Sequence, residues 1–327
     1  PTVVLDYGYD DDGNLITVTD SINGVAGGTV TYTYDEEDRV ERITQSGNGV
    51  DDQRVDFAYD PVGQFQSISR FSDVEGTMPV VTTNYTYDAL NRLERLGHSN
   101  GAGEVAFYDF DYDLANRIEQ ITDIDGVTDY SYNQRNELTG ASHSNVDNPD
   151  ETYNYDANGN RVESHLHDTD YVTGTNNQLT TDGVYTYIYD DEGNMTTQTE
   201  IATGNERIFV WDHLNRLSAV IDEDSADVVV QRVDYTYDVM NRRIAKAIDG
   251  DGDGALLAET TRFVYDRDKV LLEFEGNIAD PSMRYLHGPQ VDQVLSQEDG
   301  NDPQRLLGYH LGTIIDLDDD SGNVVNH

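Results

Sequence analysis

The chain has 327 residues, and its 64 acidic and 20 basic side chains give it a formal net charge of −44. This charge argues against binding to nucleic acid or to anionic membranes, because cationic side chains provide most of that affinity. The chain has no cysteine, which excludes disulfides and thiol chemistry, and no apolar stretch approaches membrane-spanning length. The charge is typical of a solvated acidic surface or of a protein that binds divalent cations outside the cell.

One phrase recurs along nearly the whole chain: an aromatic residue, an aspartate, a few turn-forming residues and an alternating apolar stretch. Tyr34 opens YDEEDRVERI, Tyr87 opens YDALNRLERL and Trp211 opens WDHLNRLSAV. A regular period of this length predicts repeats in which each unit packs on its neighbours. Tyr171 looks like a decayed copy inside the longest gap. We interpret eleven aromatic residues as structural anchors of the repeats: Tyr9, Tyr34, Tyr59, Tyr87, Tyr112, Tyr132, Tyr155, Tyr189, Trp211, Tyr237 and Tyr265.

Each repeat has the pattern of a β-hairpin. The anchor ends an alternating stretch, such as residues 30–34 or 184–189, which is typical of a half-buried strand. The following aspartate can accept hydrogen bonds from nearby backbone N–H groups, and a second alternating stretch begins at residues such as Arg92 and Arg117. We therefore predict an all-β chain of consecutive antiparallel hairpins. The fourth residue after the anchor is usually one that tolerates positive φ: Gly13, Gly63, Asn91, Asn116, Gly159, Gly193, Asn215 and Asn241.

An arginine recurs near the start of the second stretch. We expect these arginines to pair with the turn aspartates or to stack on tyrosine rings, which is a structural role: Arg39, Arg92, Arg117, Arg161, Arg216 and Arg242.

Two histidines lie two residues apart in the longest gap between anchors. On a strand, His165 and His167 would share one face, and Asp168 follows them. This spacing can begin a zinc site, but the sequence places no third ligand. The other interpretation is a polar strand face.

Residues 249–254 read DGDGDG. Asp249, Asp251 and Asp253 match the front half of a calcium-binding loop, but the twelfth position is Thr260, and Glu259 lies one residue early. Two interpretations stay open, an acidic hairpin tip and a weak calcium site. No other cofactor is expected. The sequence contains no nucleophile elbow, phosphate loop, dinucleotide fingerprint or zinc-protease motif, so we predict no catalytic residue and no enzyme.

The repeats resemble the tyrosine–aspartate (YD) repeats of the bacterial Rhs family, whose animal relatives are the teneurins. The family pattern, roughly Y-D-x-x-G-N/R-L, matches best at the anchors at 59, 87, 112, 155, 189, 211 and 237. Residues 284–292 resemble the segment before the family's core module, and residues 309–317 and 321–325 resemble its opening. Ile314 and Ile315 depart from it, standing where the family commonly has Pro or Val and then Arg. His310 lies in this opening, where a structural and a catalytic role are both conceivable.

A second family feature is the Asp-Pro-x-Gly at which Rhs cores are processed. Residues 60–63, DPVG, are similar to it. Because they follow Tyr59 in the register of the repeats, we interpret them as a turn, with Pro61 and Gly63 at favoured turn positions.

The resemblance implies a ribbon of about eleven hairpins over residues 1–280 and the start of a core-like segment over residues 281–327. It also implies that the ribbon curls into a partial spiral shell. About 24 strands at ~4.8 Å each give a ribbon of roughly 115 Å. This length makes about one turn of the shell wall, so we expect the chain to form a piece of a container.

In bacterial members the shell holds a C-terminal toxin. We therefore expect a structural wall segment of a secreted or cell-surface protein, whose partner is a C-terminal guest or toxin domain of the same polypeptide. The alternative is a surface adhesion or matrix protein that binds glycans or other proteins. Neither interpretation involves nucleic acid or insertion into a membrane.

Overall fold

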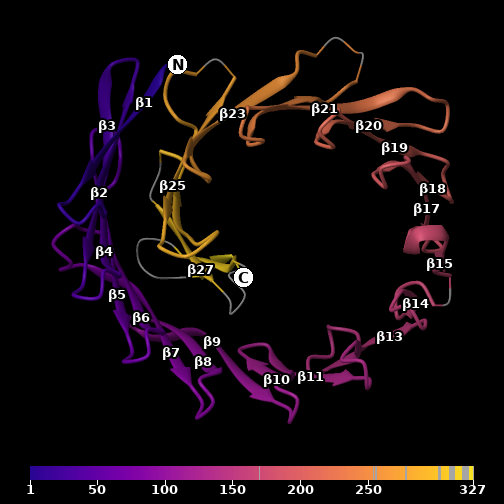
Figure 1. Cartoon of the computed structure of the whole chain (residues 1–327), viewed down its shortest axis with the longest axis horizontal. Helices are drawn as coiled ribbons and strands as arrows, with labels where there is room; N and C mark the ends of the chain where they lie inside the picture. The colour runs from indigo at the N-terminus through magenta and orange to yellow at the C-terminus, as the bar shows by residue number, and fades with distance from the viewer. Residues whose placement is uncertain are drawn as a thin grey trace. The chain divides into compact units, whose positions relative to one another are not determined.

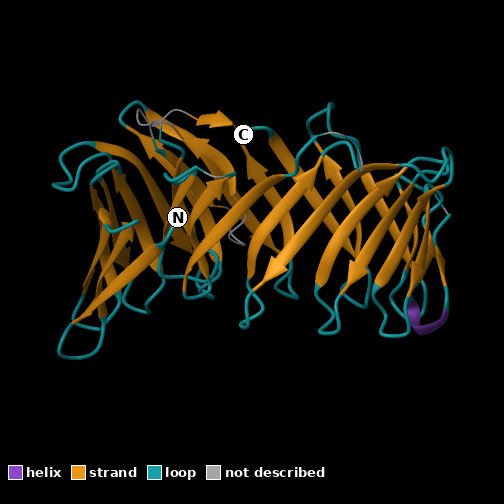
Figure 2. Cartoon of the chain, turned by 90° about the horizontal axis from the view of Figure 1, so that it is seen from above, coloured by secondary structure: helices purple, strands orange, loops and turns teal. Residues whose placement is uncertain are grey.

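The computed structural model describes residues 1–168, 170–252, 254, 256–276, 278–300, 303–308, 314–318 and 324–326. The described residues form 29 strands and one 3-10 turn, η1 (Thr175–Asn177), and they contain no α-helix. The all-β prediction is therefore confirmed. Figure 2 shows the strands side by side with loops at their two ends.

The strands lie in two antiparallel sheets, in which neighbours in the sheet are also neighbours in the sequence. The first sheet contains β1 (Val3–Tyr9), β2 (Leu15–Ile22), β3 (Val25–Tyr34), β4 (Val40–Gly47), β5 (Gln53–Tyr59), β6 (Phe65–Phe71), β7 (Pro79–Tyr87), β8 (Leu93–Asn100), β9 (Gly103–Tyr112), β10 (Ile118–Asp123), β11 (Gly126–Tyr132), β12 (Leu138–His143), β13 (Glu151–Tyr155) and β14 (Arg161–Ser164). Among the described residues, its first and last strands do not pair, so it is not a closed barrel.

The second sheet follows the same rule and is also open over the described residues. It contains β15 (Val172–Thr173), β16 (Leu179–Thr181), β17 (Tyr185–Tyr189), β18 (Met195–Glu200), β19 (Glu206–Trp211), β20 (Leu217–Glu223), β21 (Val229–Tyr237), β22 (Arg243–Asp249), β23 (Glu259–Asp266), β24 (Lys269–Glu275), β25 (Met283–His287), β26 (Val294–Glu298), β27 (Gln304–Gly308), β28 (Ile314–Asp318) and β29 (Val324–Asn326). The predicted ribbon of consecutive hairpins is confirmed.

A β-bulge immediately precedes the anchor in the hairpins of the repeat. The register shifts between Thr33 and Tyr34, between Ala58 and Tyr59, and between Val210 and Trp211. A bulge adds one residue to one strand and increases the local twist. Here the extra residue lies in the return strand: in the repeat at Tyr34 it is Glu41, between Val40 and Arg42.

By its contacts the chain divides into two units. Unit 1 comprises Pro1–Tyr112, Ile121–Asp125 and Phe263–His327, and unit 2 comprises Asp113–Gln120 and Gly126–Arg262. The predicted boundary at residue 280, between a repeat ribbon and a core-like segment, stays a prediction.

The core of unit 1 joins the two ends of the sequence. Leu286 of β25 and Leu295 of β26 are 2% and 1% exposed, and they pack with Val30, Ile43 and Ile68 of the first strands. Figure 1 shows β25 and β27 in orange to yellow beside β2–β6 in indigo to purple. Further along the same unit, Leu272 and Phe274 of β24 pack against apolar residues of β1 and β2. The C-terminal strands thus lie on one face of the first sheet.

Unit 2 has a much thinner core. Among its described residues, the buried apolar side chains are Ala141 and Ala219, and the larger apolar side chains are half-buried or exposed. The hairpins of unit 2 therefore depend on the contacts between neighbouring repeats more than on a covering layer.

Candidate functional site

Among the described residues, eight of the eleven anchor side chains donate a hydrogen bond that ties their hairpin to the one before it. The hydroxyl of Tyr34 donates a hydrogen bond of 2.8 Å to the carbonyl oxygen of Leu15, the first residue of the preceding return strand. Trp211 donates from its indole nitrogen in the same way, at 2.8 Å to the carbonyl oxygen of Met195. The same bond is made from Tyr59 to Val40, Tyr87 to Phe65, Tyr112 to Leu93, Tyr132 to Ile118, Tyr189 to Leu179 and Tyr237 to Leu217.

This contact explains why Tyr and Trp occur at the anchor where Phe does not. A partly buried backbone carbonyl needs a donor, and a phenol or an indole supplies both that donor and apolar ring surface. Burial raises the pKa of Tyr87 to about 12, with smaller contributions from Tyr85 and Asp60. The Tyr87 hydroxyl is therefore protonated at neutral pH and able to donate its hydrogen bond.

The aspartate after the anchor organises the turn. In the repeat at Tyr34, one carboxylate oxygen of Asp35 accepts from the backbone N–H groups of Glu37 at 3.0 Å and Arg39 at 2.9 Å. The other accepts from the Arg39 guanidinium at 2.7 Å. The fourth residue of the turn, Asp38, has φ 58°. The predicted positive φ at Gly13, Gly63, Asn91, Asn116, Gly159, Gly193, Asn215 and Asn241 is confirmed.

The same turn recurs in unit 2, for example at Asp212. At Asp212, the hydrogen bond from the Arg216 guanidinium outweighs desolvation and, with backbone N–H groups, lowers the pKa to about 2. The carboxylate is therefore ionised at neutral pH and holds its arginine in place.

Four of the six repeat arginines pair with a turn aspartate and also stack on a tyrosine ring. While Arg39 pairs with its own turn aspartate, its guanidinium carbon lies 4.5 Å from the ring centroid of Tyr59, the next anchor. The corresponding distances are 4.4 Å for Arg92 over Tyr112, 4.4 Å for Arg117 over Tyr132 and 4.9 Å for Arg216 over Tyr237. An arginine that pairs with its own turn aspartate and stacks on the next anchor ring links two successive hairpins. Arg161 faces two rings, at 4.8 Å from Tyr153 of its own hairpin and 5.9 Å from Tyr171, the decayed copy. Arg242 pairs with Asp238.

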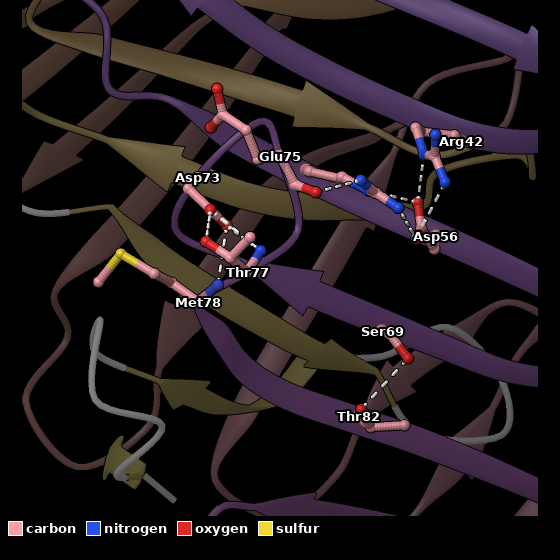
Figure 3. Close-up of polar contacts among 9 residues, drawn as sticks. Arg42, Asp56, Ser69, Asp73, Glu75, Thr77, Met78 and Thr82 are labelled. Carbon is pink, nitrogen blue, oxygen red and sulfur yellow. Dashed lines mark hydrogen bonds and ion pairs between the residues drawn. The ribbon is translucent and has the colours of Figure 1, made fainter.

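The two faces of the ribbon differ in chemistry. We call the face that carries the anchor rings the anchor face. On the opposite face of unit 1, Arg42 of β4 donates to Asp56 of β5 at 2.7 Å, and Thr82 of β7 donates to Ser69 of β6 at 3.2 Å (Figure 3). This opposite face is polar and solvated, and it needs no covering layer.

In unit 1 the C-terminal strands cover part of the anchor face, and two sets of buried polar contacts join them to it. Arg284 of β25 donates to Asp20 of β2 at 2.6 Å, and the two side chains are 7% and 2% exposed. Glu298 of β26 accepts from the Gln45 side chain and from the Asp51 backbone N–H, both at 3.2 Å. Burial, together with the charge of Asp51, raises the pKa of Glu298. These polar contacts fix the position of the covering strands.

A buried histidine lies farther along the same face. His98 of β8 is fully buried, and its Nδ1 lies 2.9 Å from the hydroxyl of Thr83, which also accepts from Arg70 at 2.8 Å. Burial, reinforced by the Arg70 charge, lowers the pKa of His98 to about 3. The imidazole is therefore neutral in the folded protein. Nothing in the sequence around His98 distinguishes it as a buried group.

The remaining predicted sites have these outcomes. Residues 60–63 form the predicted turn, with the N–H of Gly63 donating to the carbonyl oxygen of Asp60 at 3.0 Å. The prediction that His165 and His167 share a strand face is wrong, because β14 ends at Ser164 and both histidines lie in the turn after it. His310 lies outside the described residues.

Asp253, one of the three predicted calcium ligands, also lies outside the described residues. Asp249 accepts from the N–H of Asp251 at 3.3 Å, and Asp251 accepts from the N–H of Leu256 at 3.1 Å. In the part of the chain that the structure describes, no group of three or more potential ligands could hold a metal ion. Calcium binding stays a prediction, to be tested by comparing the melting temperature in millimolar calcium and in chelator.

The repeat geometry agrees with the sequence comparison. Residues 21–270 match the profile of the teneurin YD-shell family. The chain belongs to the teneurin YD-shell family. No curated protein sequence matches it. Within the described residues, no helix is long and apolar enough to cross a membrane.

Solved structures share the fold of this YD-shell chain. A crystal structure of TcdB2-TccC3-Cdc42 is 16% identical with a TM-score of 0.60, and the match covers 98% of this chain and 17% of that chain. A crystal structure of TcdB2-TccC3 is 16% identical with a TM-score of 0.58, covering 98% of this chain and 18% of that one. The Photorhabdus luminescens Tc holotoxin pore, with a TccC3 mutation, is 17% identical with a TM-score of 0.58, covering 98% and 17%. The chain thus spans less than a fifth of the length of these structures.

Proposed function

We propose that this chain is a length of wall in a secreted YD-repeat shell, and that its anchor face encloses a C-terminal polypeptide of the same protein. The mechanism is steric. The sheet screens the enclosed polypeptide from proteases and from the cell, and the repeated aromatic and acidic residues serve folding.

One observation carries this proposal. The anchor face of unit 1 already holds the chain's own C-terminal strands, with Leu286 and Leu295 buried against it and Arg284 paired with Asp20 at 2.6 Å. A sheet face that packs polypeptide from the far end of its own sequence has the surface that enclosure requires. The family assignment and the fold shared with Tc toxin proteins support the same role.

The test removes two neighbouring anchors from the full-length native protein. Replacing Tyr87 and Tyr112 by alanine deletes two links between successive hairpins. We expect the C-terminal polypeptide to become accessible to a protease that does not cut it in the wild type. The matched control replaces Thr33 and Thr236, exposed strand residues that are not anchors, by alanine. Equal protection of the C-terminal polypeptide in the anchor variant, the control and the wild type would contradict the proposal.

A further inference from the structure

Four apolar side chains form a row across neighbouring strands on the anchor face of unit 2. Phe209 of β19 pairs with Val220 of β20, Val220 pairs with Val233 of β21, and Val233 pairs with Ile248 of β22. Phe209 stands two residues before the anchor Trp211. All four side chains are half-buried, so each keeps apolar surface in contact with water.

Unit 1 contains the equivalent row in a covered state. Phe57 pairs with Ile68, Ile68 with Thr83, and Thr83 with His98, in the same steps of register. These side chains are 5%, 1%, 1% and 0% exposed. Phe57 and Ile68 are buried in the cluster that includes Leu295 of β26. The same position in the repeat is therefore buried in unit 1, where β26 packs on it, and only half-buried in unit 2.

We propose that the row Phe209–Val220–Val233–Ile248 binds an extended polypeptide segment that presents aliphatic and basic side chains on the same strand face, at alternate positions of the segment. The proposal rests on the proposed function and names the chemistry of the enclosed partner. The row crosses four strands, a span of about 14 Å, which is the length of four to five extended residues. Two or three aliphatic side chains of one strand face can therefore contact it.

The charge beside the row favours a basic partner. A groove of about 220 Å³ is lined by residues that include Glu200, Asp222 and Arg207, and the strand register places the side chains of Arg207 and Asp222 on the same face as the row. On this face of the groove, the two carboxylates of Glu200 and Asp222 outnumber the one cation, Arg207. Arg207 is already paired with Asp222 at 2.6 Å, with 51% of its side chain exposed.

Unit 1 offers the precedent for this charge pattern. There, the covering strand β25 places Arg284 on a wall carboxylate, Asp20, next to the buried Leu286. A partner of unit 2 that combines arginine or lysine with leucine or valine would repeat this combination of contacts.

The experiment uses Trp211, the single tryptophan of the chain, as a fluorescent reporter on this face. The purified chain is titrated with a nine-residue peptide in which every second residue is leucine, valine or arginine, so that these side chains share one face, and the residues between them are threonine. Two matched peptides replace either the aliphatic residues by serine or the arginines by glutamate. We expect saturable binding of the first peptide, at least tenfold tighter than binding of either control. Equal binding of all three peptides, or no binding of the first, would overturn the proposal.

Paired variants in β21 locate the site. Val233→Asp places a charge in the row, whereas Thr236→Asp places the same charge at an exposed position on the opposite face of the same strand. We expect Val233→Asp to weaken binding at least tenfold and Thr236→Asp to change it less than twofold. If Val233→Asp disturbs the fold by circular dichroism, Val233→Thr replaces it, with an expected threefold or greater weakening. Unchanged binding in the row variant would overturn the proposal.

The outcome can be separated from that of the proposed function. If the row variants bind the peptide normally and the native protein still protects its C-terminal polypeptide, this site is refuted and the proposed function is not. The peptide titration is interpreted independently of whether the anchor variants lose protection of the C-terminal polypeptide.

Discussion

Tyr237 donates its hydroxyl to the carbonyl oxygen of Leu217 at 2.8 Å, which joins two hairpins that are consecutive in the sequence. The guanidinium of Arg216, next to Leu217, lies 4.9 Å from the centroid of the Tyr237 ring. One aromatic side chain therefore donates a hydrogen bond to a carbonyl group of the preceding hairpin and stacks with the arginine of that hairpin. Repetition of this contact gives the ribbon its continuity.

The first prediction concerns the anchor hydroxyl. Tyr237→Phe keeps the ring but leaves the Leu217 carbonyl without its donor, so the free energy of unfolding should fall by about 1 kcal/mol. The control is Tyr185→Phe in β17. Among the described residues, the Tyr185 hydroxyl makes no hydrogen bond of the kind that Tyr237 makes. Urea unfolding of both variants measures the difference, and equal losses would contradict the assigned role.

The second prediction concerns pH. Since the pKa of Asp212 is lowered to about 2 in the folded state, its carboxylate stabilises the fold above the ordinary carboxyl pKa of about 4. This contribution is lost as the pH falls from about 4 towards 2. The melting temperature of Asp212→Asn should therefore lie below that of the wild type at pH 7, and the gap should close in acid. A gap that is constant from pH 7 to pH 2 would exclude this linkage.

The third prediction concerns the buried pair of unit 1. Removing one member leaves the other charge buried and unpaired, which costs about 3–5 kcal/mol. Arg284→Met and Asp20→Asn should each show a loss of this size in chemical denaturation. The double variant should recover part of the loss, because neither charge then remains. Additive losses in the double variant would show that Asp20 and Arg284 do not act as a pair.

The fourth prediction concerns His98. Its pKa of about 3 in the folded state lies below the ordinary value of about 6.5. Stability is therefore fully present above about pH 6.5 and decreases as the pH falls towards 3, because the unfolded chain takes up the proton first. His98→Phe should flatten the decrease in stability between pH 7 and pH 4, whereas His213→Asn, at an exposed turn position, should leave it unchanged. Parallel curves for the wild type and His98→Phe would contradict the buried neutral imidazole.

Much of the ribbon could be predicted from the sequence, because the information for a hairpin is local. Tyr34, Asp35 and Asp38 lie within five residues of one another, and together they specify the strand end, the turn and the positive φ. The period of the anchors then places each hairpin beside the next. The prediction fails where the period is interrupted, near the decayed copy at Tyr171. There β14 is the last strand of the first sheet and β15 is the first strand of the second sheet. His165 and His167 lie between these two strands.

The covered face could not be predicted, because its contacts are distant in the sequence. Asp20 and Arg284 are 264 residues apart, and nothing near either residue indicates its partner. The bulge before each anchor was also missed, since an extra residue in one strand leaves no trace in a pattern of alternation. The donor role of the anchors had a signal: Tyr and Trp occur at this position, and what they share is a hydrogen-bond donor on an aromatic ring.

The most direct test of the account is the intact mass of the full-length native protein purified from its own host, combined with limited proteolysis of the same sample. The account predicts a long shell fragment that co-purifies with a smaller C-terminal fragment, and the smaller fragment should resist protease until the shell is unfolded. A single uncut chain that ends in a surface anchor, or a C-terminal fragment digested as fast as free polypeptide, would contradict enclosure by the wall.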